Sequence, residues 1–222
     1  MTAAPATGAW QAAPPASPPG PPLAVLDYGI GNLRSAERAL RAVGADATLV
    51  TEPGQARGAA GVVLPGVGAF GRAAQALRDT GLDAVALDAL DRGLPFLGIC
   101  VGLQLLYVSS EEDPGVRGLG IFDAAVVRLP GGTKLPQMQW NVLDAVPGRA
   151  SRLLGEGGVG TWVYFVHSYA PQLGPETVAT CDYGGTVVAA VESGALWGTQ
   201  FHPEKSGAAG LSLLRRFVES CG

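Results

Sequence analysis

Apolar and polar residues alternate between two kinds of spacing from residue 23 to residue 104. Leu23 to Leu26 is a short apolar run, followed by a glycine-rich turn and then by apolar residues at helical spacing from Leu33 to Val43. The same succession of an apolar run, a turn and a helically spaced segment is then repeated along the chain. It predicts strands at 47–50, 61–64 and 95–99, helical segments across 69–92 with a break at Gly81, and a helix beginning near Val101. Continuous apolar strands between amphipathic helices predict an α/β fold, with an open, mostly parallel sheet and helices on both faces.

After Gly118 the apolar runs become shorter and richer in β-branched residues. They predict strands at 124–129, 161–166, 177–181, 186–191 and 196–201. A closing helix is predicted at 208–219, with Leu211, Leu214 and Val218 on one face. The second half is therefore expected to be β-rich, and no internal repeat divides the chain.

Residues 1–22 differ from the rest, because they are almost entirely Ala, Pro, Gly, Ser and Thr. Trp10 is the only large apolar side chain among them, and such a segment buries too little surface to offset its ordering entropy. We expect a disordered Pro/Ala-rich tail at 1–22 and a single domain at 23–222. The tail has neither a basic nor a continuous apolar stretch, so it is not expected to be a secretory signal.

Composition narrows the classes of function. The 222 residues are 47% hydrophobic and carry a net charge of −4 with scattered basic residues, which argues against nucleic acid or an anionic membrane as partner. No apolar run approaches the roughly 18 residues that cross a bilayer. The three cysteines contain no C-x-x-C pair, so neither a disulfide framework nor a metal site is expected, and the chain is expected in a reducing cytoplasm.

The strongest candidate for chemistry is Cys100, in the sequence Gly98-Ile99-Cys100-Val101-Gly102. It stands where an apolar strand turns into a helix, which is the spacing of a nucleophile elbow with Cys in place of Ser. Glycines are needed on both sides because larger side chains would collide in so tight a turn. The helix N-terminus favours the thiolate, and the N–H of Val101 would face a developing oxyanion. A buried inert cysteine is the alternative.

A thiolate nucleophile needs a base, and the chain has two histidines. His202 follows an apolar strand, and Glu204 two residues later can accept its imidazole N–H. The order Cys100, His202, Glu204 therefore predicts a catalytic triad. His167 also ends a strand but has no nearby carboxylate, so it is interpreted as structural or as part of the substrate wall.

Two glycine-rich turns follow predicted strands. Pro65-Gly66-Val67-Gly68 exposes backbone N–H groups where a second oxyanion donor is expected. Tyr28-Gly29-Ile30-Gly31-Asn32 does not fit a dinucleotide fingerprint, because Arg34 stands where G-x-G-x-x-G requires glycine. The second turn is interpreted as a plain turn or a partner-facing loop, and no cofactor is expected.

The chain resembles the class I glutamine amidotransferases, whose fold is flavodoxin-like. The resemblance rests on two segments, from Gly98 to Gln104 and from Gln200 to Glu204. Further segments resemble one branch, the glutaminase subunits of imidazole glycerol phosphate synthases. These are Asp27 to Leu33, Leu64 to Phe70, Tyr164 to Tyr169 and Phe201 to Ser206. The resemblance runs from about Leu23 to the C-terminus.

The resemblance implies glutamine as substrate. Cys100 would attack its carboxamide to form a thioester, and His202 would pass a proton to the leaving ammonia. Val67, Gly68 and Val101 would supply the oxyanion donors. The remaining positions implied to bind glutamine are Gly66, Gln104, Ser168 and Tyr169.

The resemblance also implies a (β/α)8 cyclase subunit, which receives the ammonia within a heterodimer and forms imidazole glycerol phosphate in histidine biosynthesis. Asn32, Trp140, Asn141 and Lys205 match positions that face this partner. One segment departs from the family: Gln137 and Gln139 replace the usual His and Gly of Pro-His-Met-Gly-Trp-Asn. If the replaced glycine has a positive φ, Gln139 carries strain of about 1 kcal/mol or requires a different turn, which would affect partner docking or activation but not hydrolysis.

Three alternatives remain open from the sequence. A glutaminase for anthranilate, aminodeoxychorismate or pyridoxal phosphate synthesis would share the chemistry but not Trp140-Asn141 or Lys205-Ser206. A catalytically silent regulatory subunit would have no need to keep Cys100, His202 and Glu204. A thiol peptidase or amidase could use the elbow but would leave Gln104 unexplained.

Overall fold

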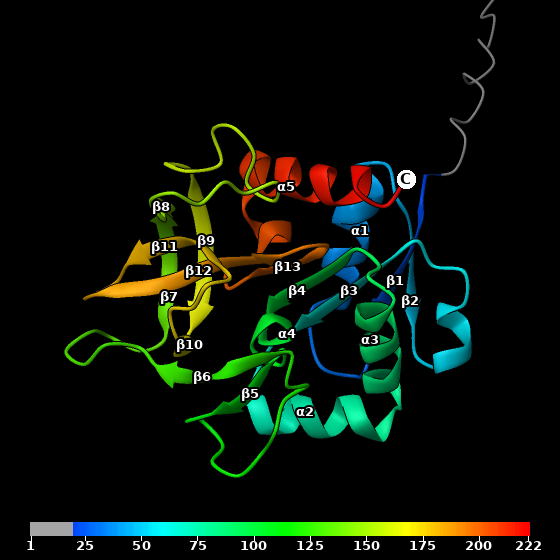
Figure 1. The fold of residues 1–222 in the computed structure, drawn as a ribbon, viewed down its shortest axis with the longest axis horizontal. Helices are drawn as coiled ribbons and strands as arrows, with labels where there is room; N and C mark the ends of the chain where they lie inside the picture. The colour runs from blue at the N-terminus through cyan, green and yellow to red at the C-terminus, as the bar shows by residue number, and fades with distance from the viewer. Residues whose placement is uncertain (1–19) are drawn as a thin grey trace, which may run out of the picture.

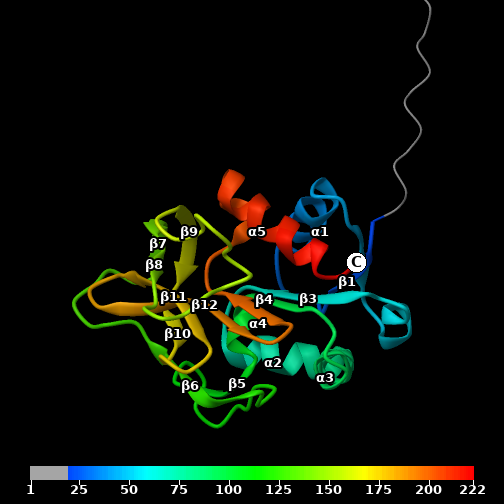
Figure 2. The same cartoon turned by 45° about the horizontal axis from the view of Figure 1, so that its top comes forward.

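The computed structural model describes residues 20–222, and residues 1–19 lie outside the described part. An eight-stranded sheet with strand order β2-β1-β3-β4-β13-β12-β11-β8 forms the centre of the molecule (Figures 1 and 2). Most of the tail predicted at 1–22 lies outside the described residues, and its last residue, Pro22, is the first of β1. The carbonyl oxygens of Pro21 and Pro22 accept hydrogen bonds from Asp46 and Ala60, which ties this end of the domain to its neighbours.

Five strands make up the parallel part of the sheet: β1 (Pro22–Leu26), β2 (Asp46–Val50), β3 (Gly61–Gly66), β4 (Phe96–Cys100) and β13 (Leu196–Thr199). Each pairs in parallel with its neighbour in the order β2-β1-β3-β4-β13. Every residue of β3 and β4 is buried. The prediction of an open, mostly parallel sheet from continuous apolar runs is confirmed.

Helices cover both faces of this sheet, as predicted. Helices α1 (Leu33–Ala42) and α5 (Gly207–Glu219) lie on one face, and α2 (Phe70–Asp79), α3 (Leu82–Asp91) and α4 (Val101–Gln104) lie on the other (Figures 1 and 2). Short 3-10 turns are η1 (Pro53–Ala56) and η2 (Pro203–Lys205). The helix predicted near Val101 starts there but ends after Gln104, because the chain enters strand β5 at Tyr107.

The second half is β-rich, as expected, and extends the sheet with antiparallel strands. Strand β12 (Thr186–Ser193) pairs with β13, and β11 (Thr177–Asp182) and β8 (Asp144–Ala145) follow. A three-stranded sheet contains β5 (Tyr107–Ser110), β6 (Phe122–Arg128) and β10 (Tyr169–Pro171). A two-stranded ribbon pairs β7 (Gln137–Val142) with β9 (Trp162–His167).

Strand β7 was not predicted, although Gln137 to Val142 alternate polar and apolar residues, which is itself a strand pattern. Gln139 lies in this extended strand, paired with Phe165 of β9. Within residues 20–222, Cys100 is the only residue other than glycine with a positive φ. Gln139 therefore carries none of the strain that a positive φ would have caused.

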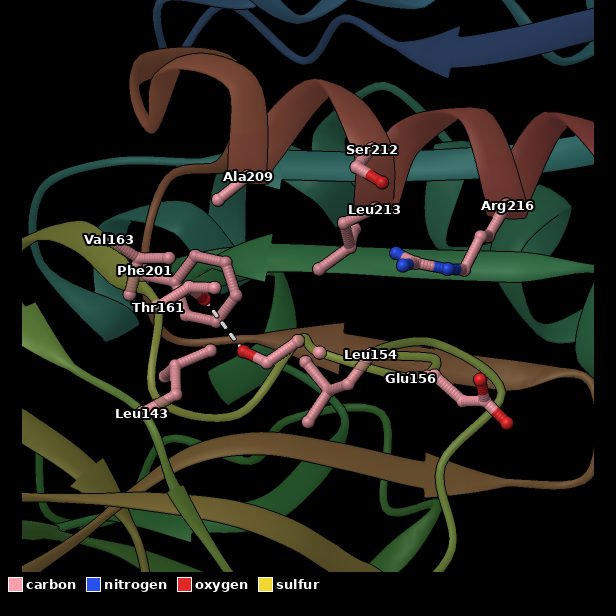
Figure 3. Close-up of a pocket in the computed structure, with 12 residues that line it drawn as sticks. Leu143, Leu154, Glu156, Thr161, Val163, Phe201, Ala209, Ser212, Leu213 and Arg216 are labelled. Carbon is pink, nitrogen blue, oxygen red and sulfur yellow. Dashed lines mark hydrogen bonds between the residues drawn. The ribbon is translucent and has the colours of Figure 1, made fainter.

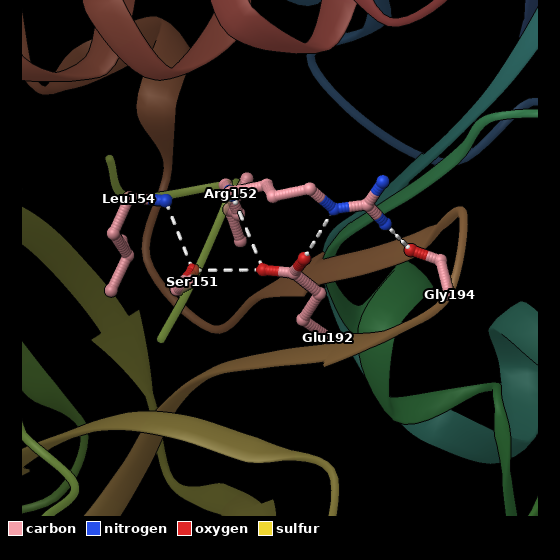
Figure 4. A network of polar contacts seen from close by, with 6 residues as sticks. Ser151, Arg152, Leu154, Glu192 and Gly194 are labelled. Atoms are coloured by element: carbon pink, nitrogen blue, oxygen red, sulfur yellow. Dashed lines mark hydrogen bonds and ion pairs between the residues drawn. The ribbon is translucent and has the colours of Figure 1, made fainter. Parts of the chain in front are cut away.

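The connection between β8 and β9 is fastened to the hairpin between β12 and β13 (Figure 4). Glu192 accepts hydrogen bonds from Ser151 Oγ at 2.9 Å and from Arg152 Nε at 3.1 Å. Arg152 also donates to the carbonyl of Gly194, within the β12–β13 turn. Residues about 40 positions apart in the chain are thus held side by side.

Candidate active site

Cys100 forms the elbow that its sequence predicted. It is the last residue of β4 and the N-cap of α4, with φ of 55° and ψ of −111°. A side chain other than glycine at such a φ costs about 1–3 kcal/mol and persists only where the surroundings enforce it. The strain holds the thiol at the strand-to-helix turn, where it is 3% exposed.

The glycines beside Cys100 are required by close packing, as expected. A Cβ on Gly98 would lie 2.9 Å from the Cα of Leu103. A Cβ on Gly102 would lie 1.7 Å from the carbonyl oxygen of Leu64, in the neighbouring strand β3. Helix α4 can therefore begin against the sheet only because both positions lack a side chain.

His202 and Glu204 form a buried pair behind this elbow. His202 Nδ1 lies 2.8 Å from Glu204 Oε1, and the two side chains are 3% and 4% exposed. The other ring nitrogen, Nε2, is buried and has no hydrogen-bond partner within residues 20–222. Ser206 Oγ donates a 2.6 Å hydrogen bond to the His202 carbonyl and so fixes the backbone of this turn.

The environment of His202 favours its protonated form. Burial lowers the pKa of His202, but the adjacent Cys100 and Glu204 together outweigh burial and raise the pKa to about 9. Glu204 acts through its 2.8 Å contact with Nδ1, and both neighbours act by charge. A carboxylate on one side of the ring and the sulfur on the other therefore suit His202 to carry a proton next to Cys100.

Sheet register brings the nucleophile and the base together. Strands β4 and β13 are parallel neighbours, with Ile99 opposite Thr199, so Gln200 follows level with Cys100. The Gln200 side chain, fully buried, donates from Nε2 to Cys100 Sγ at 3.7 Å. His202 comes two residues later, just beyond the end of β13.

A cavity of about 390 Å³ opens directly at Cys100. The residues predicted from the sequence that line it are Val67, Gly68, Cys100, Val101, Gln104, Ser168 and Tyr169. Gly66 does not line it but packs behind, where a Cβ would lie 3.1 Å from the Gly102 nitrogen. The nucleophile, the oxyanion turn and the expected substrate-binding residues thus converge on one cavity.

The Tyr169 carbonyl anchors one wall of this cavity through two hydrogen bonds. It accepts from Gln104 Nε2 at 2.8 Å and from His167 Nδ1 at 2.9 Å. Burial lowers the pKa of His167 to about 4, an effect that the nearby His202 reinforces, so His167 is neutral at physiological pH. His167 is therefore a fixed donor in the cavity wall, in line with the interpretation from the sequence.

Two residues at the site were not assigned from the sequence. Glu112 lines the cavity, and its Oε2 accepts the backbone N–H of Phe70 at 2.8 Å, at the start of α2. Gln200 lies between Gln104, whose Nε2 donates to its Oε1 at 3.1 Å, and Cys100. Gln200 is in the segment that carried the resemblance, whereas Glu112 lies in an acidic turn without any local signal.

The four residues expected at a partner interface differ from one another in their surroundings. Lys205 lies over the ring of Tyr164, with its Nζ 5.9 Å from the ring centroid, and Trp140 packs edge-on against the same ring. Asn32 is exposed at the N-terminus of α1. The Asn141 side chain is engaged internally, because it donates to the Asp182 carbonyl at 2.9 Å. Their interface role remains a prediction.

A second cavity, of about 270 Å³, lies between α5 and the segment from Leu143 to Val163 (Figure 3). Its apolar lining includes Leu154, Phe201 and Leu213, and Arg216 reaches over it from α5. None of the predicted catalytic residues lines this cavity, so the chemistry belongs to the cavity at Cys100.

Comparison with known proteins gives the family. The family model "Glutamine amidotransferase class-I" matches residues 24–221. The chain belongs to the class-I glutamine amidotransferase family. The class-I match covers nearly the whole described domain and leaves out little beyond the N-terminal tail.

Class-I relatives from several organisms are similar over almost their full length. "Imidazole glycerol phosphate synthase subunit HisH" of Methanothermobacter thermautotrophicus is 50% identical over 198 residues, which is 89% of this chain and 98% of that protein. The subunit of the same name from Moorella thermoacetica is 45% identical over 201 residues, covering 89% and 94%.

Solved structures show the same fold at lower identity. A crystal structure of a glutamine amidotransferase gives a TM-score of 0.71 at 23% identity, covering 90% of this chain and 98% of that one. The structure of PurLQS from Thermotoga maritima gives 0.69 at 21% identity, covering 91% and 97%.

Two other kinds of site are absent from residues 20–222. No helix there is both long enough and apolar enough to cross a membrane. No cluster of three or more His, Cys, Asp or Glu side chains in the same residues is arranged to hold a metal ion.

Proposed function

We propose that this chain is the glutamine-hydrolysing subunit of an imidazole glycerol phosphate synthase. It converts glutamine to glutamate and ammonia, and passes the ammonia to a (β/α)8 cyclase subunit within a heterodimer. The cyclase uses the ammonia to form imidazole glycerol phosphate in histidine biosynthesis. The observation that carries the proposal is the Cys100 elbow beside the buried His202–Glu204 pair, in a chain 50% identical to a subunit of that enzyme.

The first step is attack by Cys100. Its Sγ forms a bond to the side-chain carboxamide carbon of glutamine, and the C=O electron pair moves onto oxygen to give a tetrahedral oxyanion. His202 Nε2 then donates its proton to the amide nitrogen as the C–N bond breaks, which releases ammonia and leaves a γ-glutamyl thioester. A pKa of about 9 supports this role, because His202 then carries a proton at neutral pH.

Hydrolysis of the thioester completes the reaction. A water molecule gives one proton to His202 as its oxygen attacks the thioester carbonyl. The C–S bond then breaks, glutamate leaves, and the Cys100 thiolate and the protonated His202 with which the cycle began are restored. Glu204 holds Nδ1 throughout, so that Nε2 always faces the reacting atoms.

Backbone groups are the donors for the oxyanion. The N–H of Val101 follows the elbow directly, and the turn at Val67 and Gly68 lines the same cavity. Gly68 has a φ of +88°, a conformation that favours glycine and allows the turn to bend toward Cys100. Losing one oxyanion donor typically costs about 10²- to 10³-fold in kcat.

Polar groups in the cavity suit the charged end of glutamine. Both donors of the Gln104 amide are already used, by the Tyr169 carbonyl and by Gln200, so its Oε1 is available as an acceptor. Among residues 20–222, Glu112 is the only carboxylate that lines the cavity. We assign Glu112 and Gln104 Oε1 to the α-ammonium group, with the Ser168-Tyr169 segment along the rest of the substrate.

The outer face of the β7–β9 ribbon supports docking of a partner. Met138, Trp140 and Trp162 are 65%, 47% and 60% exposed and lie on one face, beside Tyr164 and Lys205. Grouped exposed aromatic side chains of this kind are typical of protein interfaces. The ribbon is continuous with the wall of the active-site cavity through His167, so a partner seated there would lie close to the released ammonia.

The deciding experiment is glutamate release by the purified chain, alone and with an imidazole glycerol phosphate cyclase subunit plus its ribonucleotide ligand. We expect strong stimulation by the pair and complete loss in Cys100→Ser. Cys221→Ser is the matched control, since that thiol packs against Gly61 at the opposite end of β3 from the oxyanion turn. Turnover indifferent to the cyclase would reject the assigned partner, and activity in Cys100→Ser would reject the mechanism.

A further inference from the structure

Tyr28 follows β1 and has no part in the chemistry described so far. Its hydroxyl donates a 2.8 Å hydrogen bond to the carbonyl oxygen of Pro65, the residue before Gly66 at the end of β3. We propose that Tyr28 is a positioning residue, whose hydroxyl fixes the Pro65–Gly66 peptide and thereby aims the oxyanion turn at Cys100. The inference rests on the proposed function, because the turn matters only if an oxyanion forms there.

Packing makes Tyr28, the oxyanion turn and the elbow one rigid unit. A Cβ on Gly66 would lie 2.3 Å from the Tyr28 hydroxyl, 3.1 Å from the Gly102 nitrogen and 3.2 Å from Val101 Cβ. Gly66 is therefore clamped between Tyr28 and the start of α4, with no room for a side chain. Any movement of the tyrosine is passed to the turn and not taken up by free space.

The Tyr28 hydroxyl is suited to hold this bond permanently. The residue is 3% exposed, and burial, reinforced by the charge of Cys100, raises the pKa of Tyr28 above its usual value. The hydroxyl therefore keeps its proton and remains a donor to Pro65. Tyr28 does not line the cavity, so it does not contact substrate and acts only through the peptide that it holds.

The test compares Tyr28→Phe with Tyr107→Phe. Each variant removes one buried hydroxyl and its hydrogen bond, since Tyr107 donates to Glu176 Oε1 at 2.9 Å away from the oxyanion turn. For Tyr28→Phe we expect kcat for glutamine to fall about tenfold while KM stays the same, because only the oxyanion needs the turn to be aimed. For Tyr107→Phe we expect lower thermal stability with unchanged kcat.

An inhibitor distinguishes a misplaced oxyanion turn from a general loss of rigidity in the domain. The γ-aldehyde analogue of glutamine adds the Cys100 thiol to its carbonyl, and the resulting thiohemiacetal places an oxygen where the oxyanion forms. In Tyr28→Phe its affinity should fall by the same factor as kcat, whereas the affinity for glutamate should not change. Unchanged kcat and unchanged aldehyde affinity would overturn the proposal, as would a rise in kcat.

A double-mutant cycle tests the clamp without using activity. Gly66→Ala should lower the thermal unfolding temperature sharply, and less so in the Tyr28→Phe background, where the atom 2.3 Å from the new Cβ is gone. Additive effects would show that Tyr28 and Gly66 are not in contact and would reject the clamp. If the wild-type chain released no glutamate, the proposed function would fail, whereas this cycle would still report on the contact.

Discussion

The two histidines of this chain occupy similar positions and have opposite properties. His202 and His167 both stand at the end of a strand region, both are buried, and in both Nδ1 is held by an oxygen at 2.8–2.9 Å. Yet the pKa of His202 is raised to about 9, whereas that of His167 is lowered to about 4. One is a proton carrier and the other a neutral donor.

The oxygen beside each ring explains the difference. Burial lowers the pKa of both histidines. For His202 the partner is a carboxylate and the thiol is close by, so the charged ring is stabilised more than burial disfavours it. For His167 the partner is the Tyr169 carbonyl, which carries no net charge, and the nearby His202 repels a second positive charge. Neighbouring charge, not depth of burial, decides which histidine can move a proton.

Replacing each histidine in turn should give the largest difference in kcat between the two sites. His202→Gln leaves an amide that cannot transfer a proton, and we expect kcat for glutamine hydrolysis to fall about 10²- to 10⁴-fold. His167→Asn keeps a donor near the position of Nδ1, and we expect kcat to change less than about tenfold, since no proton transfer is lost. Steady-state glutamate release measures both. Equal losses would mean that His167 also takes part in proton transfer.

Removing the carboxylate should have the next largest effect. Glu204→Gln keeps a side chain that can accept from Nδ1 but removes its charge. We expect kcat to fall roughly 10- to 100-fold, less than in His202→Gln, because the base itself remains. The pKa of His202 should fall in the same variant, as followed by its ring resonances in NMR. An unchanged pKa would show that Cys100 alone sustains the charge on the ring.

The two histidines should change the free energy of unfolding with pH in opposite directions. For His202 the folded pKa of about 9 exceeds the unfolded 6.5, so its contribution is full below 6.5 and is lost as pH rises toward 9. For His167 the folded pKa of about 4 lies below 6.5, so stability falls as pH drops from 6.5 toward 4. Inside either window the slope is up to about 1.4 kcal/mol per pH unit.

Chemical denaturation across pH 5–9 measures these slopes. His202→Gln should remove the alkaline slope only, and His167→Asn the acidic slope only. Because the chain has two histidines, NMR can follow each ring separately and assign the slopes without ambiguity. A single shared midpoint near 6.5 would contradict the contrast between the two environments.

Much of the fold and of the catalytic pair could be predicted from local sequence. Continuous apolar runs located the parallel strands, and the spacing Gly98-x-Cys100-x-Gly102 located the elbow, because each signal comes from neighbouring residues. Glu204 distinguished His202 from His167 because it stands only two residues away. Local order along the chain was enough wherever the partners are close in sequence.

The features that could not be predicted depend on contacts between distant residues. Pro21 and Pro22 were assigned to the tail from composition, and only the hydrogen bonds that their carbonyls accept from Asp46 and Ala60 tie them to the domain. Glu112 reaches the cavity from a turn that also caps α2. Tyr28 was interpreted as part of a plain turn, and only the fold brings its hydroxyl to Pro65, 37 positions later.

Strand β13 has a consequence for how the protein is made. It is the parallel neighbour of β4 and the antiparallel neighbour of β12, and it carries Gln200 and His202 to Cys100. It leaves the ribosome about a hundred residues after Cys100. A nascent or truncated chain that stops before Leu196 contains the reactive thiol without its base, and an uncovered edge on β4. Cys100 therefore cannot meet His202 until β13 and the turn after it have been made.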